Sequence, residues 1–132
     1  MTQLIKKLSE ARYLLLIGII YTSLITVAFL YPTEGLPKVT IPASDKIVHI
    51  LIHGLLAFIW LTYSYSADKY HISNKIVVVV LIVCFLYGLV IEVSQHWFTL
   101  SRQFDLLDIL ANTVGSLIGL LFFWIFRRLN IL

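Results

Sequence analysis

The sequence predicts an all-α integral membrane protein, a bundle of four membrane-spanning helices. Three observations carry this prediction. Apolar residues make up 60% of the chain, the mean hydropathy is +0.94, and the apolar residues form four long runs separated by short polar segments. Because each span takes about 20 residues, four spans and their connections use nearly all of the 132 residues. We therefore expect a single membrane domain over residues 1–132.

The first span is expected over residues 13–31, directly after Lys6, Lys7 and Arg12. Its length of about 19 uncharged residues exceeds the ~7 to 15 of a cleavable signal peptide. The run ends at Pro32 and a turn-rich stretch, not at a small-residue cleavage site. Proline and glycine in this stretch end the helix. These features indicate a retained signal-anchor helix.

Three further spans follow. Ser44 and Asp45 are suited to the N-cap of the second helix, since their side-chain oxygens can accept from free backbone N–H groups. The hydrophilic connection over residues 67–75 is short, which predicts that the spans on either side of it are antiparallel neighbours. The remaining spans are expected over residues 47–66, 76–97 and 105–126.

The basic residues near the span ends predict the orientation, because cytoplasmic loops carry an excess of Lys and Arg. One side collects Lys6, Lys7, Arg12, Lys69, Lys75, Arg127 and Arg128, and the other has Lys38, Lys46 and Arg102. Both termini are therefore expected in the cytoplasm. The net charge of +3 is explained by this flanking charge, and we expect no nucleic-acid partner.

Polar residues gather in the outward half of the predicted bundle, where ionisable groups are costly and usually functional. Asp45, His49 and His53 are spaced by four and share one stripe of the second helix. Two such histidines can share a metal, but the same spacing serves interhelical hydrogen bonds. We expect His49 to bond Glu92 or Asp108, and His53 to bond a carbonyl or hydroxyl. No metal and no cofactor is predicted.

Glu92 and Gln95 share a face of the third helix. A glutamate at this depth needs a cation, a donor or a proton, and its candidate partners are Arg102, His49 and Lys46. A structural ion pair and a substrate- or proton-handling role both remain open for Glu92. Lys46 is expected to extend toward the outer headgroups.

Asp105, Asp108 and Asn112 are spaced by three and four and lie on one face of the fourth helix. Capping alone explains Asp105, whereas Asp108 and Asn112 lie inside the helix, where capping does not require them. Gly115 and Gly119 continue the same face with the spacing that allows a second helix to approach closely. That helix belongs either to the same chain or to a second copy in a homo-oligomer.

Three segments of the chain, in this order, resemble the signature blocks of the VanZ-like family. They are Asp45-Lys-Ile-Val-His49, then Tyr87-Gly88 with Glu92-x-x-Gln95, then Arg102 through Asp108-x-x-x-Asn112-Thr-x-Gly115. The resemblance implies a multi-pass protein of the bacterial cytoplasmic membrane, and the founding member is linked to low-level resistance to the lipoglycopeptide teicoplanin. It also implies a shared ligand-binding set: Asp45, Lys46, His49, Glu92, Gln95, Arg102, Asp108 and Asn112.

The first functional hypothesis is an envelope protein whose outward polar pocket binds an amphipathic ligand. Membrane lipids, a lipid-linked cell-wall precursor or a lipoglycopeptide fit this description. Arg102 and Lys46 would contact negative groups, while Glu92, Asp108 and Asn112 would orient the ligand.

Two alternatives belong to other classes. An intramembrane hydrolase or transferase would use His49, Glu92 and Asp108 as a general acid/base set. A small proton-coupled transporter would use the intramembrane carboxylates as proton sites.

Overall fold

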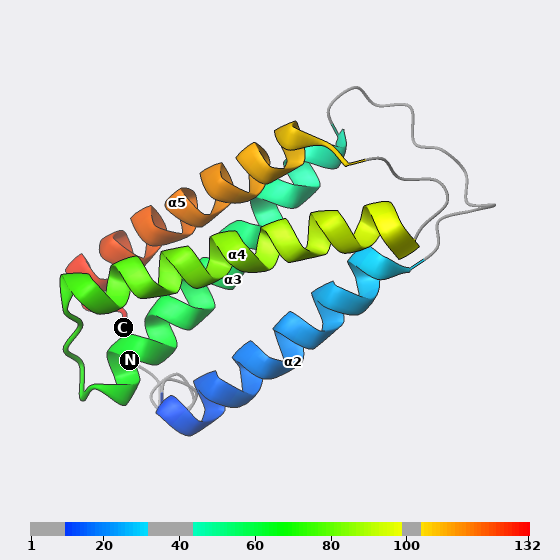
Figure 1. Cartoon of the computed structure of the whole chain (residues 1–132). Coiled ribbons are helices and arrows are strands. Elements are labelled where there is room, and N and C mark those ends of the chain that lie inside the picture. Colours follow the sequence, from blue (N-terminus) through cyan, green and yellow to red (C-terminus); the bar gives the residue numbers. More distant parts are fainter. Residues whose placement is uncertain (1–9, 32–43, 99–103) are drawn as a thin grey trace.

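The computed structural model describes residues 10–31, 44–98 and 104–132. These residues form four α-helices and no strand (Figure 1). All four helices are long and apolar enough to cross a membrane, which confirms the predicted four-span bundle. The expected spans differ from the helices by a turn or less at each end, within the usual scatter of helix boundaries. The helices are α2 (Ala11–Leu30), α3 (Ser44–Ala67), α4 (Asn74–Phe98) and α5 (Leu106–Arg128).

The helices alternate in direction, so α2 and α4 finish at the end of the bundle where α3 and α5 begin (Figure 1). We call this the acidic end, because Asp45, Asp105 and Asp108 lie there. The opposite end is the basic end and carries Lys69, Lys75, Arg127 and Arg128. Helix α3 contacts the other three helices and packs most extensively against α5, and α2 does not contact α5 within the described chain.

The two helices that begin at the acidic end start differently. The N-cap of α5 is Asp105, whose Oδ1 accepts from the backbone N–H of Leu107 at 2.8 Å, as predicted. Helix α3 already includes Ser44, so Asp45 lies in its first turn and the expected capping role of Asp45 is wrong. Residue 43, the position before the helix, lies outside the described residues. An acid in the first turn still interacts favourably with the helix dipole.

The outer faces of the bundle are apolar. Large side chains such as Leu24, Leu51, Val90 and Leu121 are more than half exposed. Continuous exposed apolar surface of this extent is unfavourable in water and suits the hydrocarbon core of a bilayer. The buried interior, by contrast, includes several polar side chains at the acidic end.

Gly115 and Gly119 are buried against α3 within the single chain. A Cβ at Gly119 would overlap the carbonyl oxygen of Gly54, and a Cβ at Gly115 would overlap that of Ile50. The absence of side chains therefore allows the two backbones to approach closely. The close contact that these glycines predict lies inside the bundle, and self-association through them stays a prediction.

Replacing Gly119 by Val should destabilise the protein, because the carbonyl of Gly54 belongs to the backbone and cannot rotate away. Overpacking of this kind costs about 1 to 3 kcal/mol. The measurement is thermal unfolding in detergent, followed by size-exclusion chromatography of heated samples. Ala28→Val, which also introduces a valine but at an exposed position of α2, is the control and should unfold like the parent. Equal stability of the two variants would contradict the close contact.

Candidate functional site

The acidic end brings together residues that are distant in sequence. Of the eight predicted ligand-binding residues, seven are described, and Arg102 lies outside the described residues. Helix α3 supplies Asp45, Lys46 and His49, α4 supplies Glu92 and Gln95, and α5 supplies Asp108 and Asn112.

Lys46 connects the first turns of α3 and α5. Its Nζ lies 2.5 Å from Asp105 Oδ2 and 2.5 Å from Asp108 Oδ1, and 4.0 Å from Asp45 Oδ2. The expectation that Lys46 extends toward the lipid headgroups is therefore wrong, because its ammonium pairs with two carboxylates of the protein. Charge-assisted hydrogen bonds of this kind are stronger than neutral ones.

Asp105 does more than cap α5. The hydrogen bond from Lys46, followed by the backbone N–H of Leu107, lowers the pKa of its carboxyl below the ordinary value. The charged form of Asp105, which pairs with Lys46, is therefore favoured. The sequence analysis missed this second role, although its spacing of three from Asp108 indicated that both carboxylates share a face.

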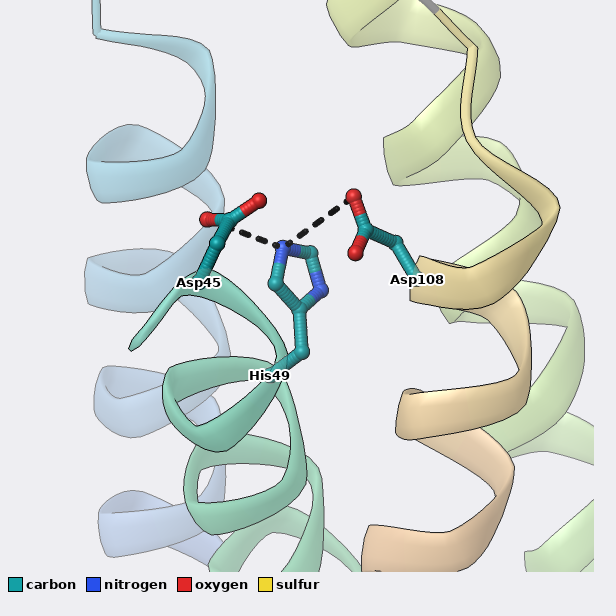
Figure 2. A group of neighbouring side chains, drawn as sticks. All are labelled: Asp45, His49 and Asp108. Atoms are coloured by element: carbon teal, nitrogen blue, oxygen red, sulfur yellow. Dashed lines mark ion pairs between the residues drawn. The ribbon is translucent and has the colours of Figure 1, made fainter. Parts of the chain in front are cut away.

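His49 is fully buried. It makes no hydrogen bond to Glu92, and it meets Asp108 at ion-pair distance and not at the expected hydrogen-bond distance. Its Nδ1 is 2.9 Å from Oδ1 of Asn112. Because an amide oxygen can only accept, Nδ1 is the donor in this hydrogen bond. The other ring nitrogen, Nε2, faces Asp45 Oδ1 at 3.9 Å and Asp108 Oδ2 at 4.0 Å (Figure 2). Both distances exceed a hydrogen bond.

Those three residues are also the candidate metal ligands at the acidic end. Asp45, His49 and Asp108 each offer one ligand atom, and the atoms lie within 4.8 Å of one another. Asp108 and His49 are buried, while the side chain of Asp45 is 54% exposed. The group therefore has a buried side and a side that opens outward.

Glu92 holds the segment that enters α5. Its carboxylate is buried, and Oε1 accepts from the backbone N–H of Asp105 at 2.9 Å. The partner is thus a backbone donor, and neither His49 nor Lys46 bonds Glu92 in the described structure. The second oxygen, Oε2, has no hydrogen-bond partner among the described residues.

Two of the polar residues lie apart from the carboxylates. Gln95 donates to the backbone carbonyl of Phe29 at 2.9 Å, so it joins α4 to the end of α2. His53 lies one turn below His49 and is buried, but neither of its ring nitrogens has a hydrogen-bond partner among the described residues. Its ring packs near Tyr87, with 5.9 Å between the ring centroids. The hydrogen bond expected for His53 is therefore wrong.

An apolar groove follows the contact between α3 and α5, with a volume of about 310 Å³. Its first lining residue, Ile50, lies one helical turn, or ~6 Å, below Lys46. Gly54 and Gly119 line it where the two helices make their close contact. The sequence analysis did not identify this groove. The larger lining residues are Leu51, Leu55, Phe58, Ile118, Phe122 and Phe126.

Comparison with known proteins places this architecture in a family. A sequence model described as VanZ/LLP1 matches residues 9–127. No curated protein and no solved structure matches the chain. The family match includes the acidic end and nearly all of the four helices, and it confirms the resemblance drawn from the three sequence blocks. This four-helix membrane protein belongs to the VanZ/LLP1 family.

Proposed function

We propose that the protein binds an amphipathic, lipid-linked ligand, with the headgroup at the acidic end and the apolar chain in the groove between α3 and α5. The observation that carries this proposal is that one helix pair supplies both parts, a polar cluster and, one turn deeper, an apolar groove. A ligand in a bilayer needs this order, because its headgroup stays at the interface while its chain lies in the hydrocarbon.

The polar cluster suits a headgroup rich in hydroxyl and amide groups. Asp45 and Asp105 are partly exposed and can accept from O–H and N–H groups, while Lys46 can donate. The charge of Lys46 is already balanced by two carboxylates, so hydrogen bonding supplies the recognition in place of attraction to an anion. The sugar and peptide groups of a lipid-linked cell-wall precursor have this chemistry.

The groove suits an acyl or polyprenyl chain. It is lined by aliphatic and phenyl side chains, and Leu51, Leu55 and Phe122 are also exposed on the outer face of the bundle. A chain can therefore enter sideways from the bilayer. The groove volume lies at the lower end of the range typical of small-molecule sites.

We further propose that the acidic end faces outward in a bacterial cytoplasmic membrane and that both termini are cytoplasmic. Lys69, Lys75, Arg127 and Arg128 at the basic end support this orientation. Ligands of the outer leaflet then reach the acidic end directly.

The alternative of an intramembrane hydrolase has weaker support. His49, Glu92 and Asp108 do gather at one end, but the 4.0 Å between His49 Nε2 and Asp108 Oδ2 exceeds the ~2.6 to 3.2 Å of a working acid/base pair. Proton-coupled transport would use Glu92, whose buried carboxylate is occupied by a backbone donor. Ligand binding is the function that the geometry supports best.

The orientation is tested by cysteine labelling in spheroplasts with a membrane-impermeant maleimide. Phe104→Cys at the acidic end should be labelled in intact spheroplasts, and Asp68→Cys, between α3 and α4, should be labelled after lysis. Both positions are exposed, and the native Cys84 is buried. The reverse pattern would place the acidic end in the cytoplasm.

Ligand binding is tested in nanodiscs with a fluorescent polyprenyl phosphate that carries an N-acetylated sugar, whose headgroup offers hydroxyl and amide groups. Binding is followed by anisotropy. Leu55→Trp fills the groove and should weaken binding roughly tenfold, since each buried CH₂ contributes ~0.8 kcal/mol and two displaced groups suffice. Leu86→Trp, at an exposed position of α4 outside the groove, should bind like the parent. Equal affinity of both variants would exclude the groove as the chain site.

Family membership suggests that the ligand site contributes to lipoglycopeptide resistance. Expression in a susceptible host should raise the teicoplanin concentration that stops growth. Lys46→Ala should remove this protection, because the ion pairs that join the start of α3 to the start of α5 are lost. Lys75→Ala at the basic end should retain it at equal protein level. If the parent protein does not protect the host cells from teicoplanin, the proposed role in resistance is wrong. Ligand binding is then judged by the anisotropy measurement alone.

A further inference from the structure

We propose that Asp45, His49 and Asp108 bind a divalent transition-metal ion, Zn²⁺ or Mn²⁺, at the acidic end (Figure 2). One imidazole nitrogen and two carboxylate oxygens, drawn from α3 and α5, converge there within 4.8 Å of one another. Carboxylate and imidazole together suit these ions, whereas calcium and magnesium take oxygen ligands alone.

The strongest support for a metal site is the hydrogen bonding and burial of the two ring nitrogens of His49. Its Nδ1 donates to Asn112, so in the neutral imidazole Nε2 carries the lone pair that a metal ion requires. The side chain is 0% exposed, and Nε2 has no hydrogen-bond partner among the described residues. Metal-ligating histidines characteristically donate their second ring nitrogen to a nearby oxygen, which fixes the tautomer and orients the ring. Asn112 does this here.

The two carboxylates present oxygens to the same point. Asp45 Oδ1 and Asp108 Oδ2 lie 3.9 and 4.0 Å from Nε2. These are ion-pair distances, too long for hydrogen bonds, and the three atoms face one another across a shared space. Two ligands of a tetrahedral zinc ion lie ~3.4 Å apart when each is ~2.1 Å from the metal. Rotation of the exposed Asp45 side chain can bring its carboxylate closer, and a shift of about half an ångström between His49 and Asp108 completes the geometry.

The charge balance favours a divalent ion. Among the described residues, Asp45, Asp105 and Asp108 are opposed by Lys46, which leaves two negative charges before Glu92 is counted. A divalent ion neutralises them. Lys46 contacts Oδ1 of Asp108, and Oδ2 faces His49, so the lysine and the ion use different oxygens.

Three protein ligands leave coordination positions open, and Asp45 marks the outward side of the site. An ion there can accept a phosphate oxygen from a bound headgroup. This role rests on the proposed function, whereas binding of the ion itself does not.

The test uses the full chain in detergent, with its affinity tag removed and its metal stripped by EDTA. Titration with Zn²⁺ and, separately, Mn²⁺ should give saturable binding of one ion per chain by calorimetry and metal analysis. Asp45→Ala should weaken binding at least tenfold and remain folded, since its side chain is half exposed. Asp108→Asn should also weaken metal binding at least tenfold and remain folded.

Asn112→Ala retains all three ligands but removes the partner of Nδ1, and loss of such a partner lowers metal affinity about 10- to 100-fold. His71→Ala, in the exposed connection between α3 and α4, is the control for adventitious binding and should bind like the parent. Thermal unfolding of each variant establishes that it is folded.

Absence of saturable binding to the parent would overturn the proposal. Parent-like binding by Asp45→Ala and Asp108→Asn would overturn it as well. The titrations contain no lipid, and the polyprenyl phosphate measurement is repeated in EDTA. Metal binding without lipid binding refutes the proposed function alone, and lipid binding in EDTA without metal binding refutes the metal site alone.

Discussion

The close contact between α3 and α5 is the constraint on which the rest of the structure depends. Lipid is as apolar as the helix surfaces, so spans associate through close packing and polar contacts and not through hydrophobic burial. Gly115 and Gly119 allow the backbones to meet, and Lys46 holds the two helix starts together through two aspartates. That register places His49 beside Asn112 and opposite Asp108.

The same contact produces both halves of the candidate ligand site. Without side chains at Gly54 and Gly119, the helices approach closely, and the apolar groove lies beside this contact. One turn toward the interface, the helix starts bring their carboxylates around Lys46. A tightly packed helix pair therefore carries a polar cluster above an apolar groove, the arrangement that an amphipathic molecule requires.

The acidic end also concentrates polar atoms whose hydrogen-bonding capacity is unused. His49 Nε2, Glu92 Oε2 and Asn112 Nδ2 are buried there without hydrogen-bond partners among the described residues. In a medium of low dielectric constant each such atom costs free energy. A bound ion or headgroup would recover part of that cost, which is the physical reason to place function at this end of the bundle.

The amino-acid sequence was enough to predict the four spans, the cap at Asp105 and the gathering of polar residues at one end. Length, hydropathy and helical spacing are local properties and suffice for these features. The tertiary structure decided the partners: Asn112 for His49, two aspartates for Lys46, and the end of α2 for Gln95. Spacing shows which residues share a face of one helix. Which atoms meet depends on how each helix is rotated and shifted against its neighbour, and in this bundle the glycine contact between α3 and α5 sets that register.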